Sequence, residues 1–446
     1  MKTETPNWGI EPVPERLRVL GGLDTALLWG NLGVSLLVLV AAAFLVPALS
    51  LPEAVVAIVL GALIGNLMLA AAGAIGADAR VPAMVLMRAP LGRRGSYLPT
   101  VLNVAQCLGW AIFELIIIAA AAAALSDEIF GFAGRPFWTV LFGIGAGALA
   151  LLGPVGFVRR FVRRFALWAV LASLLYLSWW GLDGADLGTV WRADGEGGSS
   201  VVLGIDLVVA ITVTWIPLAA DYTRFSRTRS GAFVGTFVGY FVPSLWMFLL
   251  GSLLVLGRDL SDPVAVTAAV AAAGVTAALA LFAVTVDETD EAFANTYSTA
   301  VSLQNLLPGV PQRLLVVVAA AIATVGALTI ELRNYEAFLL LLGSFFVPLF
   351  GVLLADWLLA GRRYTTTDIF HGPAFRPELI VAWLAGFALY QWLHPTGPNW
   401  WVDLVDRANA GEFDIGATVP SFLASFLLAA AFAALAGRQA AARAGA

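Results

Sequence analysis

Apolar runs of membrane-spanning length recur along the whole chain, and short segments rich in Pro, Gly and Arg separate them. An α-helix rises about 1.5 Å per residue, so roughly twenty apolar residues cross the hydrocarbon core of a bilayer. The runs predict twelve spanning helices, near residues 20–48, 53–76, 97–125, 136–157, 164–182, 201–223, 232–257, 276–303, 313–330, 335–359, 377–394 and 416–437. We therefore expect an all-α polytopic membrane protein.

The composition indicates the same class of protein. Hydrophobic residues make up 60% of the 446 residues and charged residues 12%, whereas an ordinary soluble domain is about 25% charged. No predicted loop is long enough to fold as a separate domain, so the function must lie in the membrane-spanning part. The single Cys107 excludes an internal disulfide.

The basic residues are divided unequally between the two sides of the predicted membrane. Five of the 25 Lys and Arg residues fall in loops opposite the N-terminus: Arg135, Arg192, Arg258, Arg333 and Arg407. The others fall on the N-terminal side, and an excess of Lys and Arg marks the cytoplasmic side of a membrane. We expect a multi-pass protein of the plasma (inner) membrane, with a cytoplasmic segment at 1–19, a cytoplasmic tail at 438–446 and an even number of spans.

The run DETDE at 287–291 places four carboxylates near the middle of the apolar stretch 276–303. An ionised carboxylate at the bilayer centre costs about 2.5–3.5 kcal/mol, so four facing lipid would cost on the order of 10 kcal/mol. Asp287, Asp290 and Glu291 share one helical face, with Glu288 and Asn295 beside it. No Lys or Arg is predicted at the same depth, so these acids need a polar interior with a bound cation, protons or both.

Two other predicted spans contain residues that interrupt helices. The first has the sequence WGNLG at 29–33. Its two glycines could open the helix and expose backbone carbonyls, or could let a neighbouring helix pack closely. The sixth contains Pro217, which removes a helix hydrogen bond and produces either a break or a plain kink.

The third predicted span carries an acid with no basic residue within one turn. Gln106, Trp110 and Glu114 are spaced by four residues, so they form one polar and aromatic stripe along a helix. Trp110 alone would be an ordinary core residue. Beside an intramembrane Glu, it is a candidate stacking surface for a flat ligand.

Interruptions in the first and sixth spans, with polar residues in the third and eighth, are typical of secondary transporters built from inverted repeats. In such proteins, carbonyls of an unwound helix and oxygens of a facing helix bind an ion beside the substrate. The two interruptions lie five spans apart. The repeat itself is not visible in the residues.

Several motifs resemble the nucleobase:cation symporter-1 family of permeases for purines, cytosine, hydantoins and hydroxymethylpyrimidine. They are NWGIEPVP followed by LLWGNLGVSLLVL in the first span, PLGRRGSY with LNVAQCLGW at the third, WIPLAADYTRFSR at the sixth and FVPLFGVLLADWLL at the tenth. The resemblance extends from about residue 7 to residue 360. LNVAQCLGW, WIPLAADYTR and DEAFANTYS are most similar to the hydroxymethylpyrimidine permease branch.

The resemblance implies a five-plus-five inverted repeat of the leucine-transporter type, with repeats at 20–182 and 201–359 and two additional helices at 377–437. It also implies secondary active transport, in which Na⁺ or a proton drives import of a small planar heterocycle. No enzyme activity, no cofactor and no nucleic-acid partner are expected, and the oligomeric state is left open.

Some site residues are implied by the same resemblance. Trp110 matches the family's stacking Trp, and Glu114 matches a position where many members carry Gln. Thr212 and Trp215 are both candidates for the sixth-span aromatic position. The implied cation site comprises the segment of Gly30, Asn31 and Gly33 and the region around Asp290 and Glu291, and a Na⁺ ion would take Gly30, Gly33, Asp290 and Glu291. Asp287, on the same helical face as these acids, is a further cation-coupling candidate. Sodium-coupled members tend to carry Ser or Thr where this chain has carboxylates, so the coupling ion is left open.

The side chains favour an aminopyrimidine substrate. An ionised Glu only accepts hydrogen bonds, whereas Gln both donates and accepts. We therefore expect Glu114, with Gln106 and Asn295, to bind hydroxymethylpyrimidine or cytosine rather than uracil or hydantoin. Two alternatives stay open: an amino-acid carrier on the same scaffold, and a Mg²⁺-dependent intramembrane transferase, which would need a second acid cluster where the sequence has only the single Asp206 and Asp221.

Overall fold

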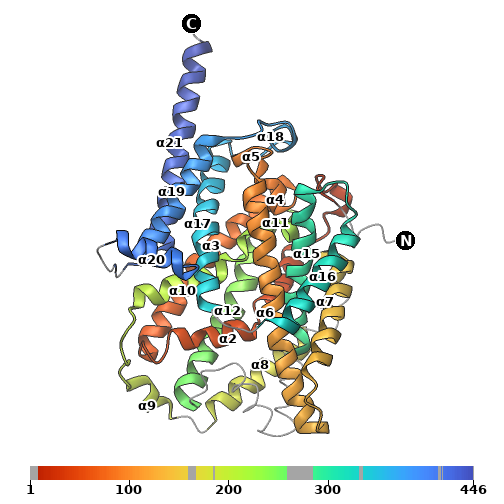
Figure 1. Ribbon diagram of the computed structural model, residues 1–446, viewed down its shortest axis with the longest axis vertical. Coiled ribbons are helices and arrows are strands. Elements are labelled where there is room, and N and C mark those ends of the chain that lie inside the picture. The colour runs from red at the N-terminus through yellow and green to blue at the C-terminus, as the bar shows by residue number, and fades with distance from the viewer. Residues whose placement is uncertain are drawn as a thin grey trace.

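The computed structural model describes residues 9–158, 167–183, 186–258, 285–330, 335–409, 413 and 415–444. In these residues the chain is helical, without a β-sheet, and the helices form one bundle from which the end of the last helix projects (Figure 1). The expected all-α fold is confirmed.

The helices lie close to the ranges expected from the sequence. Up to residue 192 they are η1 (Glu15–Leu17), α1 (Gly22–Leu32), α2 (Leu36–Ala41), η2 (Ala42–Phe44), α3 (Leu51–Ala79), α4 (Ala83–Leu86), α5 (Arg88–Leu91), α6 (Tyr97–Phe130), α7 (Arg135–Phe157), α8 (Leu167–Leu182) and α9 (Leu187–Arg192). The remainder are α10 (Val201–Val213), α11 (Ile216–Thr223), α12 (Arg229–Arg258), α15 (Thr289–Leu306), α16 (Gln312–Thr329), α17 (Tyr335–Leu359), α18 (Thr366–Phe370), α19 (Pro377–Leu393), α20 (Asn399–Ala408) and α21 (Thr418–Ala444).

Many of these helices can cross a membrane. Within the described residues, eight spans are long and apolar enough, and α1 with α2 and η2 forms a ninth candidate. Each of the twelve predicted ranges contains a helix, although residues 164–166 and 276–284 lie outside the described part of the chain. The polytopic membrane protein is therefore confirmed, whereas the count of twelve spans and the inverted repeat stay predictions.

The first span is broken. α1 ends at Leu32, α2 begins at Leu36, and the helix axes on either side of the break differ by 56°. Ser35 is the N-cap of α2, because its hydroxyl accepts hydrogen bonds from the backbone N–H groups of Leu37 and Val38. The interpretation of WGNLG as an opening of the helix is confirmed.

Gly33 serves close packing as well. A Cβ added at Gly33 would lie 2.7 Å from Cγ of Pro243 and 3.3 Å from the carbonyl oxygen of Tyr240, both on α12. At Gly30 the nearest atom is the carbonyl oxygen of Gly239, at 3.5 Å, which is an ordinary contact. Both interpretations of the two glycines therefore apply. The helix opens in the segment WGNLG, and Gly33 also allows α12 to pack closely.

A Gly33→Ala substitution should destabilise the protein by about 1–3 kcal/mol, because overpacking forces α1 and α12 apart. The midpoint of thermal unfolding in detergent measures this effect. Gly30→Ala is the matched control on the same helix and should unfold close to the wild-type temperature. Equal midpoints for the two variants would contradict the packing role of Gly33.

The sixth span contains a shallower interruption. α10 ends at Val213, Thr214 and Trp215 form a turn, and α11 begins at Ile216. Pro217 lies in the first turn of α11, where its missing N–H is not needed. The side-chain amide of Gln106 donates to the carbonyl oxygen of Thr214 at 2.9 Å and so satisfies a backbone group at the turn.

The two interrupted spans and the acid-bearing helices meet inside the bundle. α1 packs on α12, α3 packs on α10 and α12, and α15 packs on α6 and α7. Figure 1 shows α15 (teal) beside α6 (orange), although they are far apart in the sequence. Direct contacts of α1 and α11 with α15, and of α2 with α6, bring residues of the first, third, sixth and eighth predicted spans together.

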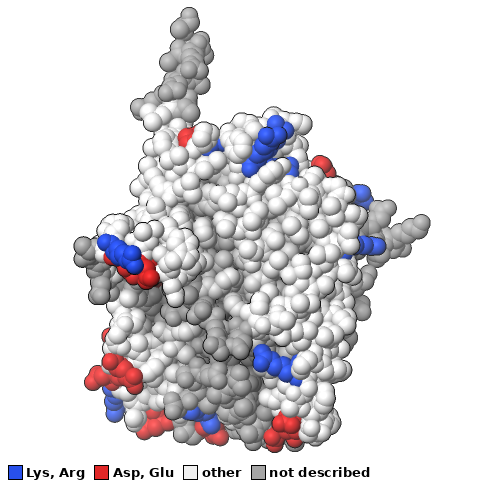
Figure 2. Space-filling model, in the orientation of Figure 1, with Lys and Arg blue, Asp and Glu red and all other residues white. Residues whose placement is uncertain are grey.

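The outer surface fits a membrane environment. On the face shown in Figure 2, charged atoms lie mainly toward the upper and lower ends and at both side edges, and most of the described surface between them is uncharged. Large apolar side chains along the spans, including Leu60, Leu67, Ile144 and Val325, are exposed. Such side chains face lipid in a membrane-spanning bundle.

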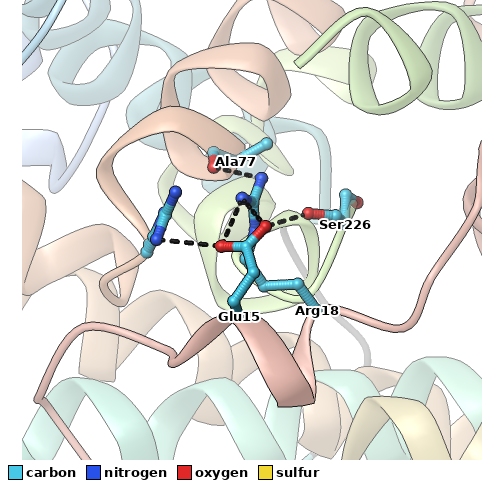
Figure 3. Close-up of polar contacts among 5 residues, drawn as sticks. Glu15, Arg18, Ala77 and Ser226 are labelled. Carbon is cyan, nitrogen blue, oxygen red and sulfur yellow. Dashed lines mark hydrogen bonds and ion pairs between the residues drawn. The ribbon is translucent and has the colours of Figure 1, made fainter. Parts of the chain in front are cut away.

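An arginine joins the N-terminal segment to the bundle. Arg18 donates to the carbonyl oxygen of Ser226 at 2.9 Å and to that of Ala77 at 3.3 Å (Figure 3). Its guanidinium also forms an ion pair with Glu15, and Arg80 forms a second ion pair with Glu15. These contacts hold η1 against the end of α3 and against the segment between α11 and α12.

Asp206 of α10 joins the last helix to the sixth span. Its carboxylate is buried and accepts hydrogen bonds from the backbone N–H groups of Ala417 (3.0 Å) and Thr418 (2.8 Å), where α21 begins. A carboxylate at this place satisfies free N–H groups and favours the positive end of the helix dipole.

An Asp206→Ala substitution should lower the free energy of unfolding by about 1–3 kcal/mol, because two buried N–H groups lose their acceptor. Thermal unfolding in detergent tests this. Asp186→Ala is the matched control, since Asp186 caps the short, exposed helix α9 in the same manner. If the Asp186 variant lost as much stability as the Asp206 variant, the buried cap would not be the cause.

Candidate substrate cavity and acidic cluster

Five carboxylates lie together inside the bundle: Glu114 of α6, Asp287 and Glu288 just before α15, and Asp290 and Glu291 in its first turn. None is more than 4% exposed. No described Lys or Arg forms an ion pair with any of them. The acids therefore face the interior and not lipid, as expected, and their negative charge needs protons or a bound cation.

Glu288 holds the break in the first span. Its carboxylate oxygens accept from the backbone N–H of Leu36 at 2.9 and 3.0 Å, and Oε1 accepts from the hydroxyl of Ser35 at 3.1 Å. These donors form the N-terminus of α2, which carries a partial positive charge. Glu288, an acid of the eighth predicted span, thus stabilises α2, which is the second half of the first span.

Asn31 holds two further acids. Its side-chain amide donates to Oδ1 of Asp287 at 2.9 Å and to Oδ2 of Asp290 at 2.6 Å. The other oxygen of each carboxylate has no hydrogen-bond partner among the described residues. The sequence predicted that backbone carbonyls of residues 29–33 are exposed near the acids. In the structure, the side-chain amide of Asn31 makes the direct contact with the acids.

Three glutamates form the part of the cluster best able to share a cation. Glu114, Glu288 and Glu291 each place one carboxylate oxygen within 4.8 Å of the other two. Oε2 of Glu114 and Oε1 of Glu291 are buried without a hydrogen-bond partner in the described part of the chain. Carboxylate oxygens in this arrangement can bind a hard cation such as Na⁺, or can share protons.

A cavity adjoins these glutamates. Glu114 and Glu291 contribute to its wall, so the cavity and the acidic cluster share two side chains. The lining consists of Ser35, Leu37, Val38, Trp110, Glu114, Ile211, Thr214, Trp215, Leu218, Tyr240, Glu291 and Asn295. The lining combines apolar and aromatic side chains with a smaller number of polar ones, which is the usual composition of a small-molecule site.

Edge-to-face contacts fix the two tryptophans of the cavity. The ring centroid of Trp110 lies 5.6 Å from that of Phe338, at an interplanar angle of 67°. The Trp215 ring lies 5.9 Å from that of Trp29, at 87°. Such pairs are favourable and hold each ring in one orientation.

The structure brings most of the predicted site residues together. Trp110, Glu114, Trp215, Asn295 and Glu291 line the cavity. Asn31 is hydrogen-bonded to Asp287 and Asp290 in the acidic cluster and is not among the cavity-lining residues. The functions assigned to these residues stay predictions.

Other candidates lie outside the cavity lining. Gln106 donates to Asn103 and to the Thr214 carbonyl, and Thr212 contacts Gly65 of α3. Of the two sixth-span candidates, Trp215 is therefore the residue at the cavity. Gly30 and Gly33 have no side chain and face α12 at the position of a Cβ. Any ion contact of these residues would therefore come from their backbone carbonyls.

Sequence reasoning missed Ser35 and Tyr240 as cavity residues. A Ser directly before the apolar run LLVLV is an N-cap signal, so Ser35 could have been identified as the start of α2. Tyr240 carries no such signal, because it lies in an unremarkable part of an apolar helix and reaches the cavity only through tertiary packing.

A bundle of spanning helices with a broken first span, and with buried carboxylates beside an aromatic cavity, is typical of secondary membrane transporters. Residues 12–401 match the sequence profile of the family described as permeases for cytosine, purines, uracil, thiamine and allantoin. The chain belongs to this family, the nucleobase:cation symporters. It is a multi-pass membrane transporter and not an enzyme.

Two curated relatives are similar over most of their length. The hydantoin permease of Microbacterium maritypicum is 24% identical over 365 residues, which are 78% of this chain and 74% of the relative. The cytosine permease of Escherichia coli (strain K12) is 27% identical over 355 residues, 75% of this chain and 78% of the relative.

Solved structures show the same fold. Mhp1, a nucleobase-cation-symport-1 family transporter in a closed conformation with bromovinylhydantoin bound, has a TM-score of 0.80 at 21% identity, with 96% of both chains covered. Its inward-facing conformation has a TM-score of 0.76 at 19% identity.

The transferase alternative is wrong, because the relatives are permeases. The structure also accounts for Asp206 and Asp221, the two single acids that the sequence offers in place of a second acid cluster. Asp206 caps α21, and Asp221 accepts a hydrogen bond from the backbone N–H of Ala83 at 2.8 Å, where α4 begins. Neither belongs to a second acid cluster among the residues that the structure describes.

Proposed function

We propose that the protein imports a small planar aminopyrimidine, hydroxymethylpyrimidine or cytosine, by cation symport across the plasma (inner) membrane, with both termini in the cytoplasm. The family and the two curated permeases support a heterocyclic substrate. The observation that carries the choice of an aminopyrimidine is Glu114, which places a carboxylate in the cavity one turn from Trp110.

The recognition part of the proposal follows from hydrogen-bond chemistry. The substrate ring stacks on Trp110, and Trp215 borders the same cavity. Glu114 accepts hydrogen bonds from an exocyclic amine and a protonated ring nitrogen, because an ionised carboxylate has acceptors and no donor. Asn295, which also lines the cavity, contacts another edge of the ring.

The coupling part of the proposal assigns the cation to the glutamates beside the cavity. Glu291 belongs both to the cavity wall and to the group of Glu114, Glu288 and Glu291. A Na⁺ ion or a proton bound there reduces the charge repulsion that buried carboxylates otherwise exert on one another. Cation binding therefore favours the state that accepts the substrate.

Transport by the wild-type protein in proteoliposomes tests the proposal. Radiolabelled cytosine and hydroxymethylpyrimidine are offered with a Na⁺ gradient and a pH gradient imposed separately, and unlabelled amino acids, uracil and hydantoin are added as competitors. We expect saturable accumulation of an aminopyrimidine under one of the gradients. Absence of accumulation of both pyrimidines under either gradient would refute the substrate assignment. Inhibition of their uptake by amino acids alone would also refute it and would support the amino-acid carrier.

A further inference from the structure

A second concave region lies at the end of the bundle where basic residues gather, away from the transport cavity. It is bounded by α3, by the first turns of α12 and by the end of α17. Arg229 is the first residue of α12, and Arg362 lies three residues beyond the end of α17. The groove is therefore at the depth where membrane-spanning helices meet the lipid headgroups.

The polar end of this groove is positively charged. Arg229 and Arg362 both line it, and none of its described lining residues is Asp or Glu. Neither arginine forms an ion pair with an acid in the described ranges. The guanidinium of Arg229 lies over the ring of Trp357, 5.0 Å from its centroid, and donates to the carbonyl oxygen of Arg362 at 3.3 Å. These contacts hold Arg229 in place but leave its charge uncompensated.

The remainder of the groove is apolar and continues along α12. Ala71, Phe233 and Leu358 form its walls. At Ser230 and Val234 it meets a second groove between α1 and α12, which is lined almost wholly by Gly, Ala, Val and Leu. Two apolar channels thus lead away from one pair of arginines.

We propose that this region binds one anionic phospholipid, with its phosphate between Arg229 and Arg362 and its acyl chains along the two grooves beside α12. Basic pockets between spanning helices bind acidic headgroups, and each Arg near the surface contributes about 1 kcal/mol. The apolar channels distinguish a lipid from a free phosphate, which would use only the arginines. The lipid also lies against α12, on which the broken first span packs.

Lipid binding to the purified, delipidated full chain in detergent tests the proposal. Phosphatidylglycerol and phosphatidylcholine with identical acyl chains are added, and bound lipid is counted by native mass spectrometry. Wild type should prefer phosphatidylglycerol. In an Arg229→Gln/Arg362→Gln variant its affinity should fall about 30-fold, which corresponds to two charges at about 1 kcal/mol each. Arg94→Gln, an exposed arginine outside the groove, is the matched control and should bind as wild type does.

Two further arms keep the test independent of whether the double variant folds. An Arg229→Lys/Arg362→Lys variant retains both charges and should retain most of the binding. Raising NaCl from about 50 mM to about 500 mM should weaken phosphatidylglycerol binding by the wild type, since salt screens surface charges. Equal affinity for the two lipids, binding insensitive to salt, or protection from thermal unfolding by inorganic phosphate as strong as by phosphatidylglycerol would each overturn the lipid site.

Discussion

Concentrative uptake should disappear in a Glu291→Gln variant. Glu291 lines the cavity and shares the acidic cluster with Glu114 and Glu288, so its amide analogue removes one of the charges that a coupling cation neutralises. Under an imposed gradient, the internal substrate concentration should not rise above the external one, whereas wild type should accumulate the substrate. Proteoliposome uptake of the substrate identified for the wild type measures this difference.

Substrate exchange without a gradient separates loss of coupling from loss of the site. The Glu291→Gln variant should still exchange internal unlabelled substrate for external labelled substrate, because Trp110, Glu114 and Asn295 are unchanged. Asp206→Asn is the matched control, since it converts a buried acid outside the cavity to its amide. Normal accumulation by the Glu291 variant would show that this residue does not handle the coupling cation.

A Glu114→Gln variant should change which heterocycle is preferred. An amide can donate to a ring carbonyl, and it accepts less strongly than a carboxylate from an exocyclic amine. A hydrogen bond to a charged group contributes about 1.5–3 kcal/mol, so the ratio of kcat/KM for cytosine over uracil should fall roughly 10- to 150-fold. Competition between the two labelled pyrimidines during initial uptake measures the ratio.

A Trp110→Phe variant provides the comparison for this selectivity. The smaller ring reduces stacking with any flat substrate, so uptake of both pyrimidines should weaken while their ratio stays near the wild-type value. An unchanged ratio of kcat/KM for cytosine over uracil in Glu114→Gln would mean that another group binds the exocyclic amine. The proposed recognition by Glu114 would then be wrong, even if the protein transported cytosine.

The architecture could be predicted because a membrane-spanning helix depends on properties of one continuous stretch of sequence. Length, apolarity and interrupting residues suffice to place such helices, and each predicted range contains one in the part of the chain that the structure describes. The break at WGNLG could also be anticipated, because glycine and a following N-cap residue act within one turn.

The contacts of the site could not be predicted, because they join residues far apart in the chain. Glu288 lies 252 positions from the Leu36 N–H that it accepts from, and Asn31 lies 256 positions from Asp287. Hydrophobic periodicity gives no information on such pairs. The residue of the sixth span that faces the cavity could not be predicted either. The turn at Thr214 and Trp215 places Trp215 at the cavity and leaves Thr212 against α3.

The capping of α2 by Glu288 has a consequence for how the chain is made. Synthesis proceeds from the N-terminus, so the first broken span enters the bilayer long before its acidic partners have left the ribosome. Until then the Asn31 amide and the backbone N–H of Leu36 need other polar partners, because lipid supplies none. The first span is therefore expected to reach its final bent form only after residues 287–291 have been inserted. We therefore expect the proposed transport site to assemble late and cooperatively, after most of its helices have been inserted.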